Sequence, residues 1–99
     1  MADPEKKELQ IEIDEATAQG IYSNLAFLTH SEQEFILDFI FMSPQQPKAK
    51  VRSRIITSPK HAKRLFMALM DNIKKYEDRF GKIPIDNNHQ DKGPEGLYN

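Results

Sequence analysis

The most apolar stretch of the chain is residues 34–42, where seven large apolar side chains are interrupted only by Asp38. A strand with one buried face alternates apolar and polar positions, whereas this stretch is apolar at both alternations. We therefore predict a central strand whose two faces both need a covering layer. A polar turn at residues 30–33 precedes it, and Pro44 and Pro47 follow it.

Two further strand patterns flank this central stretch. Residues 21–29 and 49–57 are predicted as strands on either side of it, which gives an antiparallel meander. Residues 9–13 alternate apolar and polar positions and are predicted as a further short strand. Residues 15–20 are predicted as a connector, and one helical turn at residues 16–18 remains an alternative.

The register of the meander is predicted from burial, because a slip of one residue moves every side chain to the other face. Pairing odd-numbered with odd-numbered residues collects the largest apolar side chains on one face. This odd face, predicted as the core, holds Ile21, Leu25, Phe27, Phe35, Leu37, Phe39, Phe41, Val51 and Ile55. On the opposite, even face, Asp38 lies across from Arg54 or Arg52 and gains an ionic partner.

A long helix is predicted between Ser58, a good N-cap, and Gly81, which suits the position after the last turn. Pro59 suits its first position, and its length is about 33 Å at 1.5 Å per residue. We expect the helix to cover the odd face and to overhang it slightly. Its apolar stripe consists of Ala62, Leu65, Phe66, Leu69, Ile73, Tyr76 and Phe80.

These elements predict one α+β domain over residues 9–85, in which a small antiparallel meander of three or four strands packs on one long C-terminal helix. A disordered N-terminus (1–8) and a disordered tail (86–99) are predicted on either side of it. A chain of 99 residues buries little of its surface, and without cysteine it has no disulfide. We therefore expect a homodimer that covers the even face and the helix overhang. The predicted interface residues are Leu28, Ile36, Asp38, Ile40, Met42, Tyr76 and Phe80.

Charge is unevenly distributed, although the net charge is only −1. Acidic residues dominate up to residue 47 and basic residues dominate residues 48–75. Basic side chains at a helix start oppose the helix dipole, which suggests a binding role for an anion or an acidic partner segment. The predicted anion or partner site consists of Ser58, Lys60, His61, Lys63 and Arg64, with Arg52 and Arg54 from the last strand. The alternatives are that water screens these charges, or that the arginines pair with Asp38 and the acidic half across a dimer.

Catalytic patterns are not found in the sequence. His30, His61 and His89 have no ligand-type residue at metal-binding spacing, and the four glycines are scattered. We therefore expect no enzyme activity, no metal and no cofactor. The first residues lack the apolar segment of a signal peptide and no apolar run reaches the ~20 residues of a membrane helix. We therefore expect a cytoplasmic protein that has no membrane partner.

The chain resembles a known family of short prokaryotic proteins, the domain-of-unknown-function family numbered 3467, over residues 21–85. The matching segments are Glu34-Phe35-x-Leu37-Asp38-Phe39, Arg54-Ile55, Ser58-Pro59-x-His61-Ala62-Lys63-x-Leu65 and Asn72-Ile73-x-x-Tyr76-Glu77-x-x-Phe80-Gly81. The resemblance implies a stand-alone bacterial domain and brings no activity or cofactor with it. The meander and helix are also loosely similar in architecture to the protein-export chaperone SecB.

The function expected from these observations is non-enzymatic binding or assembly by a small homo-oligomer. One alternative is nucleic-acid binding through the basic strand, whose alternating basic residues should all point one way, and through the helix start. The residues of this alternative are Lys50, Arg52, Arg54, Lys60, Lys63 and Arg64. Against it stands a sequence pI near 6.3 and the lack of a known nucleic-acid motif. The other alternative is a SecB-like chaperone that binds extended polypeptide on an open even face.

Overall fold

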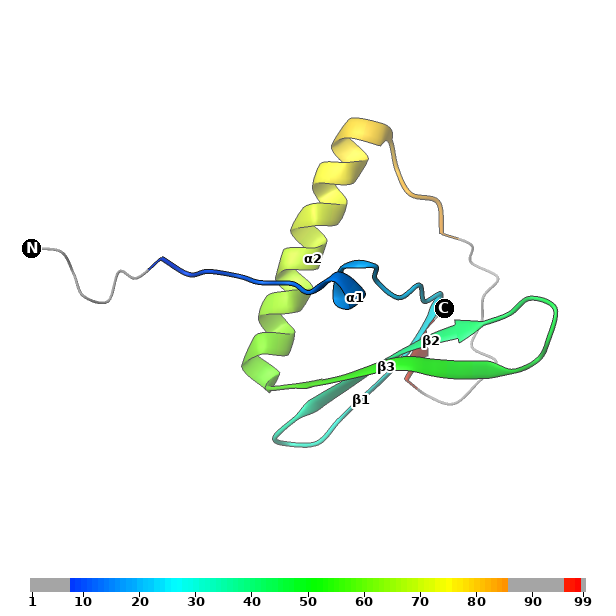
Figure 1. The fold of residues 1–99 in the computed structure, drawn as a ribbon. Coiled ribbons are helices and arrows are strands. Elements are labelled where there is room, and N and C mark those ends of the chain that lie inside the picture. Colours follow the sequence, from blue (N-terminus) through cyan, green and yellow to red (C-terminus); the bar gives the residue numbers. More distant parts are fainter. Residues whose placement is uncertain (1–7, 86–95, 99) are drawn as a thin grey trace, which may run out of the picture.

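The computed structural model describes residues 8–85 and 96–98, which form an α+β fold (Figure 1). Within these residues a four-stranded antiparallel sheet has the order β3-β2-β1-β4 and is accompanied by one long helix, α2. The predicted meander, the β3 bounds and the α2 bounds are confirmed. The elements in chain order are α1 (Glu15–Ala18), β1 (Leu25–His30), β2 (Phe35–Met42), β3 (Ala49–Thr57), α2 (Pro59–Phe80) and β4 (Leu97–Tyr98).

The segment before β1 differs from the prediction. Residues 9–13 form no strand, and α1 is the single helical turn that remained an alternative, capped by Asp14 Oδ1 accepting from Thr17 N at 2.8 Å. β1 begins at Leu25 instead of residue 21. The reason is that the Asn24 side chain bonds both backbone groups of Met42, each at 3.0 Å, at the last residue of β2. Residues 21–23 therefore have no β2 backbone left to pair with.

The predicted register between the first two strands is wrong. Leu25 pairs with Ile40 and His30 with Phe35, so odd-numbered residues face even-numbered ones. The cause is the four-residue connection 31–34, which is closed by a hydrogen bond from Ser31 N to Glu34 O at 2.9 Å. Loop length fixes hairpin register, and here it outweighs the preference of individual side chains. As a result Leu25 and Phe27 lie on the even face of β2, with Asp38 and Ile40.

The register between β2 and β3 is partly as predicted. Asp38 lies opposite Arg54, but the register shifts between Phe39 and Ile40, whose partners are Ser53 and Val51. Arg52 is the extra residue of this bulge. Because a bulge moves the following side chains to the other face, Lys50 pairs with Phe41 on the odd face while Arg54 lies on the even face. The expectation that the basic residues of this strand all point one way is therefore wrong.

Burial is slight and lies on the unexpected face. Among the described residues, the buried side chains are Leu25 at 8 % exposure, Ile40 at 7 % and Asp38 at 3 %, all on the even face. Phe35, Leu37 and Phe39, on the odd face, are half-buried. Ile40 and Asp38 were expected to be covered by a second copy, whereas a single copy already buries them.

α2 has the predicted caps but not the predicted packing. Ser58 Oγ accepts from His61 N at 3.1 Å, and Gly81, with a φ of 98°, donates from its N to Glu77 O at 2.9 Å. Within the described chain no α2 side chain is buried, and the helix rises away from the sheet (Figure 1). Ser58 alone connects β3 to α2. Strand-to-helix connections usually need two to six residues, so this one is too short to lay the helix along the sheet.

β4 lies within residues 86–99, the segment that was predicted as a disordered tail. Residues 86–95 and 99 of this segment lie outside the described residues. Most of the predicted disordered N-terminus also lies outside them. Leu97 and Tyr98 pair with Phe27 and Ala26 of β1. Just before β4, Gly96 has a φ of 97° and its carbonyl oxygen accepts from Leu28 N at 2.7 Å. A Cβ atom at Gly96 would lie 2.6 Å from Leu28 O.

Gly96→Ala is expected to detach β4, because the added methyl meets backbone and the left-handed φ already costs about 1–2 kcal/mol for an L-residue. Amide exchange at Leu28 should accelerate by about tenfold or more, measured by hydrogen exchange and NMR. Gly20→Ala is the control, since Gly20 has a φ of 76° and open space where its Cβ would stand. Unchanged exchange at Leu28 in Gly96→Ala would contradict the pairing of β4.

Candidate functional site

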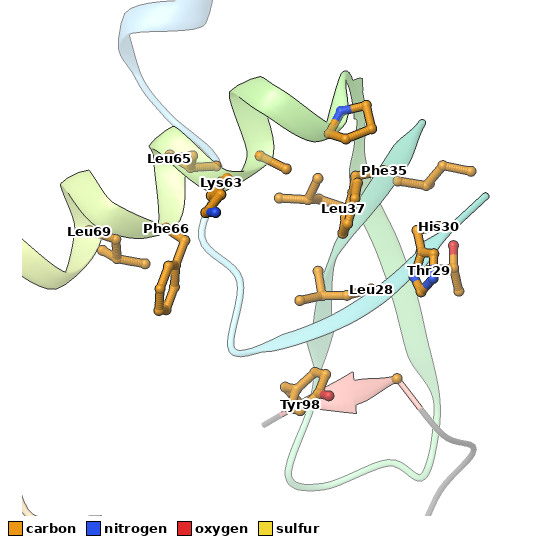
Figure 2. A pocket seen from close by; sticks show the side chains of 14 residues that line it. Leu28, Thr29, His30, Phe35, Leu37, Lys63, Leu65, Phe66, Leu69 and Tyr98 are labelled. Atoms are coloured by element: carbon orange, nitrogen blue, oxygen red, sulfur yellow. The ribbon is translucent and has the colours of Figure 1, made fainter. Parts of the chain in front are cut away.

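A groove of about 980 Å³ separates the first half of α2 from the odd face of the sheet (Figure 2). Its sheet wall includes Leu28, Leu37 and Tyr98, and its helix wall includes Ala62, Phe66 and Leu69. The helix wall arises from the apolar stripe of α2, and the sheet wall from the register that puts Leu28 directly opposite Leu37. Figure 2 shows Phe66 and Leu69 projecting from the helix on the side of Leu28.

Polar side chains lie at the edge of this groove. Lys63 lines it from α2 and His30 lines it from the end of β1. The His30 ring stacks on Phe35, with ring centroids 5.2 Å apart and planes inclined by 24°. The groove is thus an apolar surface with a cation at one edge, suited to an apolar partner that carries an acid.

A second, smaller concavity of about 310 Å³ lies on the same face of the sheet. Thr17 and Gly20, from α1 and the turn after it, form one side, and Phe39 and Ile55 form the other. The α1 segment therefore lies over the middle of the odd face, and α2 lies over the end near Phe35.

The residues of the predicted anion or partner site are only partly brought together. The helix start places Ser58, Lys60, His61, Lys63 and Arg64 in two turns, and the Ser58 hydroxyl is already used as a cap. Arg54 lies in an ion pair on the even face, and Arg52 lies in the bulge. Anion binding at the helix start stays a prediction.

Asp38 on β2 and Arg54 on β3 form a bidentate ion pair. Arg54 Nε donates to Asp38 Oδ1 at 2.7 Å and Arg54 Nη2 donates to Asp38 Oδ2 at 3.0 Å. The hydrogen bonds from Arg54 lower the pKa of Asp38 below its ordinary value, against the opposing effect of desolvation. The same hydrogen bonds raise the pKa of Arg54. This pair satisfies the one acid within the apolar central strand.

Asp38→Asn is expected to remove part of the acid sensitivity of folding. Because the pKa of Asp38 is lower in the folded chain, its ionised form stabilises the fold above the unfolded pKa, near 4, and this contribution is lost as the pH falls through the folded pKa. When the pH is lowered below 4, the urea midpoint of the wild type should decrease more than the midpoint of Asp38→Asn. At pH 7 the variant should be less stable than the wild type. Asp71→Asn, from the exposed pair with Lys75 at 3.2 Å, is the control and should follow the wild type. Parallel acid profiles of wild type and Asp38→Asn would contradict a folded-state role of the pair.

The residues of the predicted dimer interface divide into three groups. Asp38 and Ile40 are buried, and Ile36 and Met42 are half-buried on the even face. Leu28 lies on the odd face and lines the groove, which the predicted register did not allow. Tyr76 and Phe80 are exposed on α2, with ring centroids 5.0 Å apart.

The groove itself was missed by the sequence analysis, although half of it was visible there. The apolar stripe of α2 contained Phe66 and Leu69, which form its helix wall. Its sheet wall depends on the register between β1 and β2, and Tyr98 stood outside the predicted fold. A correct reading of the four-residue turn at 31–34 would have placed Leu28 beside Leu37.

Other kinds of site were sought in the described ranges 8–85 and 96–98. There, no three side chains of His, Asp or Glu gather closely enough to hold a metal ion. No helix in these ranges combines the length and the apolar character needed to cross a membrane.

Comparison with known proteins identifies a family and nothing closer. Neither a curated protein nor a solved structure matches the chain. One family model matches residues 1–85, which include α1, the three long strands and all of α2. The chain therefore belongs to the family described as "Protein of unknown function (DUF3467)".

Proposed function

We propose that this protein is a non-enzymatic homo-oligomer with a binding or assembly role, in which a second copy covers the groove and the apolar side of α2. One observation carries the proposal. Within the described residues a single copy buries only Leu25 and Ile40 among its large apolar side chains, and α2 contributes none. Apolar surface of this extent on a small domain usually marks an interface, and further burial adds to the stability of a chain this short.

The nucleic-acid alternative gains no support from this geometry. A backbone-binding surface needs several basic side chains on one face. The bulge places Lys50 and Arg54 on opposite faces, and Arg54 is engaged by Asp38. We expect no salt-dependent binding of DNA or RNA at low salt, measured by fluorescence anisotropy. Binding that weakens steeply with salt would favour the alternative.

A second candidate function is binding of an extended or unfolded polypeptide, as in SecB-like chaperones. The observation that favours it is the volume and apolar lining of the groove, which in a single copy is open. A client segment would then take the place of the second copy. The two functions differ in what occupies the groove when the protein is pure.

The mass of the purified protein tests the proposed function. Light scattering should give twice the chain mass of 11.5 kDa at micromolar concentration. A single-chain mass at every protein concentration up to about 100 µM would contradict it, because the association would then be weaker than about 5.5 kcal/mol. If the monomer also suppressed aggregation of an unfolded client, the second candidate would take its place.

A further inference from the structure

The apolar residues on one side of α2 follow a heptad pattern. Their spacing alternates between four and three residues over the whole helix, which is the pattern of helices that pack against another helix. The opposite side carries the ion pairs Asp71–Lys75 and Lys74–Asp78, at 3.2 and 3.4 Å. We call the apolar row the seam. It consists of Ala62, Phe66, Leu69, Ile73, Tyr76 and Phe80.

The two halves of the seam have different surroundings. Ala62, Phe66 and Leu69 line the groove over the sheet. Ile73 and Phe80 belong to the half of α2 that extends beyond the sheet (Figure 1), and both are exposed. One half thus forms a groove without an occupant in the described chain, and the other half is an apolar ridge of the same spacing.

We propose that two copies associate through an antiparallel pair of α2 helices, in which the second half of each seam fills the groove of the other copy. This arrangement rests on the proposed function and specifies its interface. Its layers follow from the spacing: Ala62 meets Phe80 of the second copy, Phe66 meets Tyr76, and Leu69 meets Ile73. Each pairing occurs twice, because the arrangement is symmetric about Asp71, midway between Ala62 and Phe80.

Charge distinguishes the antiparallel pairing from the parallel one. Lys63 and Glu77 each lie one residue after a seam residue, on the same edge of the seam. In the antiparallel pair Lys63 therefore lies beside Glu77 of the second copy, next to the layer of Phe66 and Tyr76. In a parallel pair Lys63 would lie near Ser58 and gain no acid. A parallel pair would also bring both sheets to one end and leave the second halves of both seams outside either groove.

The local structure prepares both charged residues for this contact. Lys63 already lines the groove. Glu77 is half-buried, and its Oε2 accepts a hydrogen bond from Ile83 N at 2.9 Å, which fixes the carboxylate at the edge of the seam. A carboxylate can accept further hydrogen bonds on its other oxygen, so Glu77 can keep this contact and still bind Lys63 of the second copy.

The surface area that each copy could bury in this arrangement is in the range of a stable interface. Phe66, Tyr76 and Phe80 are each at least half exposed, so each can bury roughly 100 Å² more. Together with Leu69, Ile73 and the groove residues Leu28 and Tyr98, each copy approaches the roughly 800 Å² per partner of a standard interface.

Charge exchange tests the predicted contact. Lys63→Glu and Glu77→Lys should each raise the dimer dissociation constant about tenfold, and the double variant should recover most of the loss, measured by sedimentation. An acid near the start of a helix favours the helix, so Lys63→Glu cannot act by unfolding α2. Lys60→Glu makes the same charge change on the outer side of the first turn and is the control. Equal effects of Lys60→Glu and Lys63→Glu, or no recovery in the double variant, would overturn the proposal.

Cross-linking tests the direction of the helices and separates this proposal from the proposed function. The chain has no cysteine, so one introduced thiol is unique. Met70→Cys lies at the symmetry axis on the edge of the seam and should give dimers with a short bismaleimide. Phe80→Cys should not, because the two copies of residue 80 would be about 27 Å apart along the helices.

The outcomes of this cross-linking experiment are distinct. Cross-linked Phe80→Cys, in a wild type of dimer mass, would replace the antiparallel pair by a parallel one, whatever Met70→Cys does, and leave the proposed function standing. A dimer that neither variant cross-links places its interface elsewhere on the chain and overturns only the arrangement. A wild type of single-chain mass would overturn both.

Discussion

Leu69→Asp is expected to convert the protein into a folded monomer. Leu69 is 56 % exposed in a single copy, so the aspartate remains hydrated there and the sheet is not affected. In the dimer the same side chain would be enclosed by Ile73 of the second copy and by the groove, and this happens twice. Removing a carboxylate from water without a partner costs several kcal/mol per ion. The dimer dissociation constant should therefore rise at least about a thousandfold, equivalent to about 4 kcal/mol.

Met67→Asp is the matched control for this substitution. Met67 is 58 % exposed, two residues before Leu69 and on the outer side of α2, so the same charge is introduced at the same exposure away from the seam. It should leave the dimer intact in sedimentation velocity runs at equal concentration. Equal dissociation of the two variants, or an intact Leu69→Asp dimer, would contradict the role of the seam.

Ile40→Ala is expected to cause the largest loss of stability in the sheet. Ile40 is 7 % exposed in a single copy and pairs with Leu25, the other buried apolar residue among those described. Truncating a buried isoleucine to alanine usually costs about 2 to 5 kcal/mol, from lost burial and the cavity left behind. The loss should appear in urea unfolding, and it should persist in the Leu69→Asp monomer because this burial lies within one copy.

Ile56→Ala is the control for Ile40. Ile56 lies on the same even face, opposite Ile36, but is 54 % exposed. Its truncation should cost less than about 1 kcal/mol, since the methyl groups it removes are largely in water. If the two truncations cost the same, or if the Ile40→Ala loss vanished in the monomer, the core would not lie where the structure places it.

The elements that the sequence predicts well are those whose signals are local. The bounds of α2 follow from Ser58, Pro59 and Gly81, and β3 is bounded by prolines on one side and Ser58 on the other. The pairing of Asp38 with an arginine, either Arg54 or Arg52, also follows, because a single acid in an apolar strand needs a cation on the neighbouring strand. The signals that bound α2 and β3 each act over a few residues and compete with little else.

The features that the sequence does not predict depend on geometry between elements. The register of β1 is set by a four-residue turn, and the split of Lys50 from Arg54 is set by one bulged residue. The direction of α2 follows from a one-residue connection, which no hydrophobic pattern records. Half of the groove, the helix side, is therefore visible in the sequence, whereas its sheet side appears only when Leu28 and Leu37 are seen to pair.

The same geometry explains why the interface proposed from the structure differs from the one expected from the sequence. The sequence suggested that the even face needs a partner because it is apolar and the helix covers the other face. In the structure the even face buries Leu25 and Ile40 within one copy, and a groove separates the helix from the end of the odd face near Phe35. Of the residues expected at the interface, Leu28, Tyr76 and Phe80 belong to the new proposal.

Hydrogen exchange along α2 tests most directly whether a second copy covers the helix. A helix of this length without buried side chains is only marginally stable in water, so its protection must come from packing. We predict that amides of the second half of α2 are protected in the wild type at high concentration and lose this protection on dilution and in Leu69→Asp, while amides of β2 stay protected throughout. Equal protection of α2 in the wild type and in a monomeric Leu69→Asp variant would contradict the account.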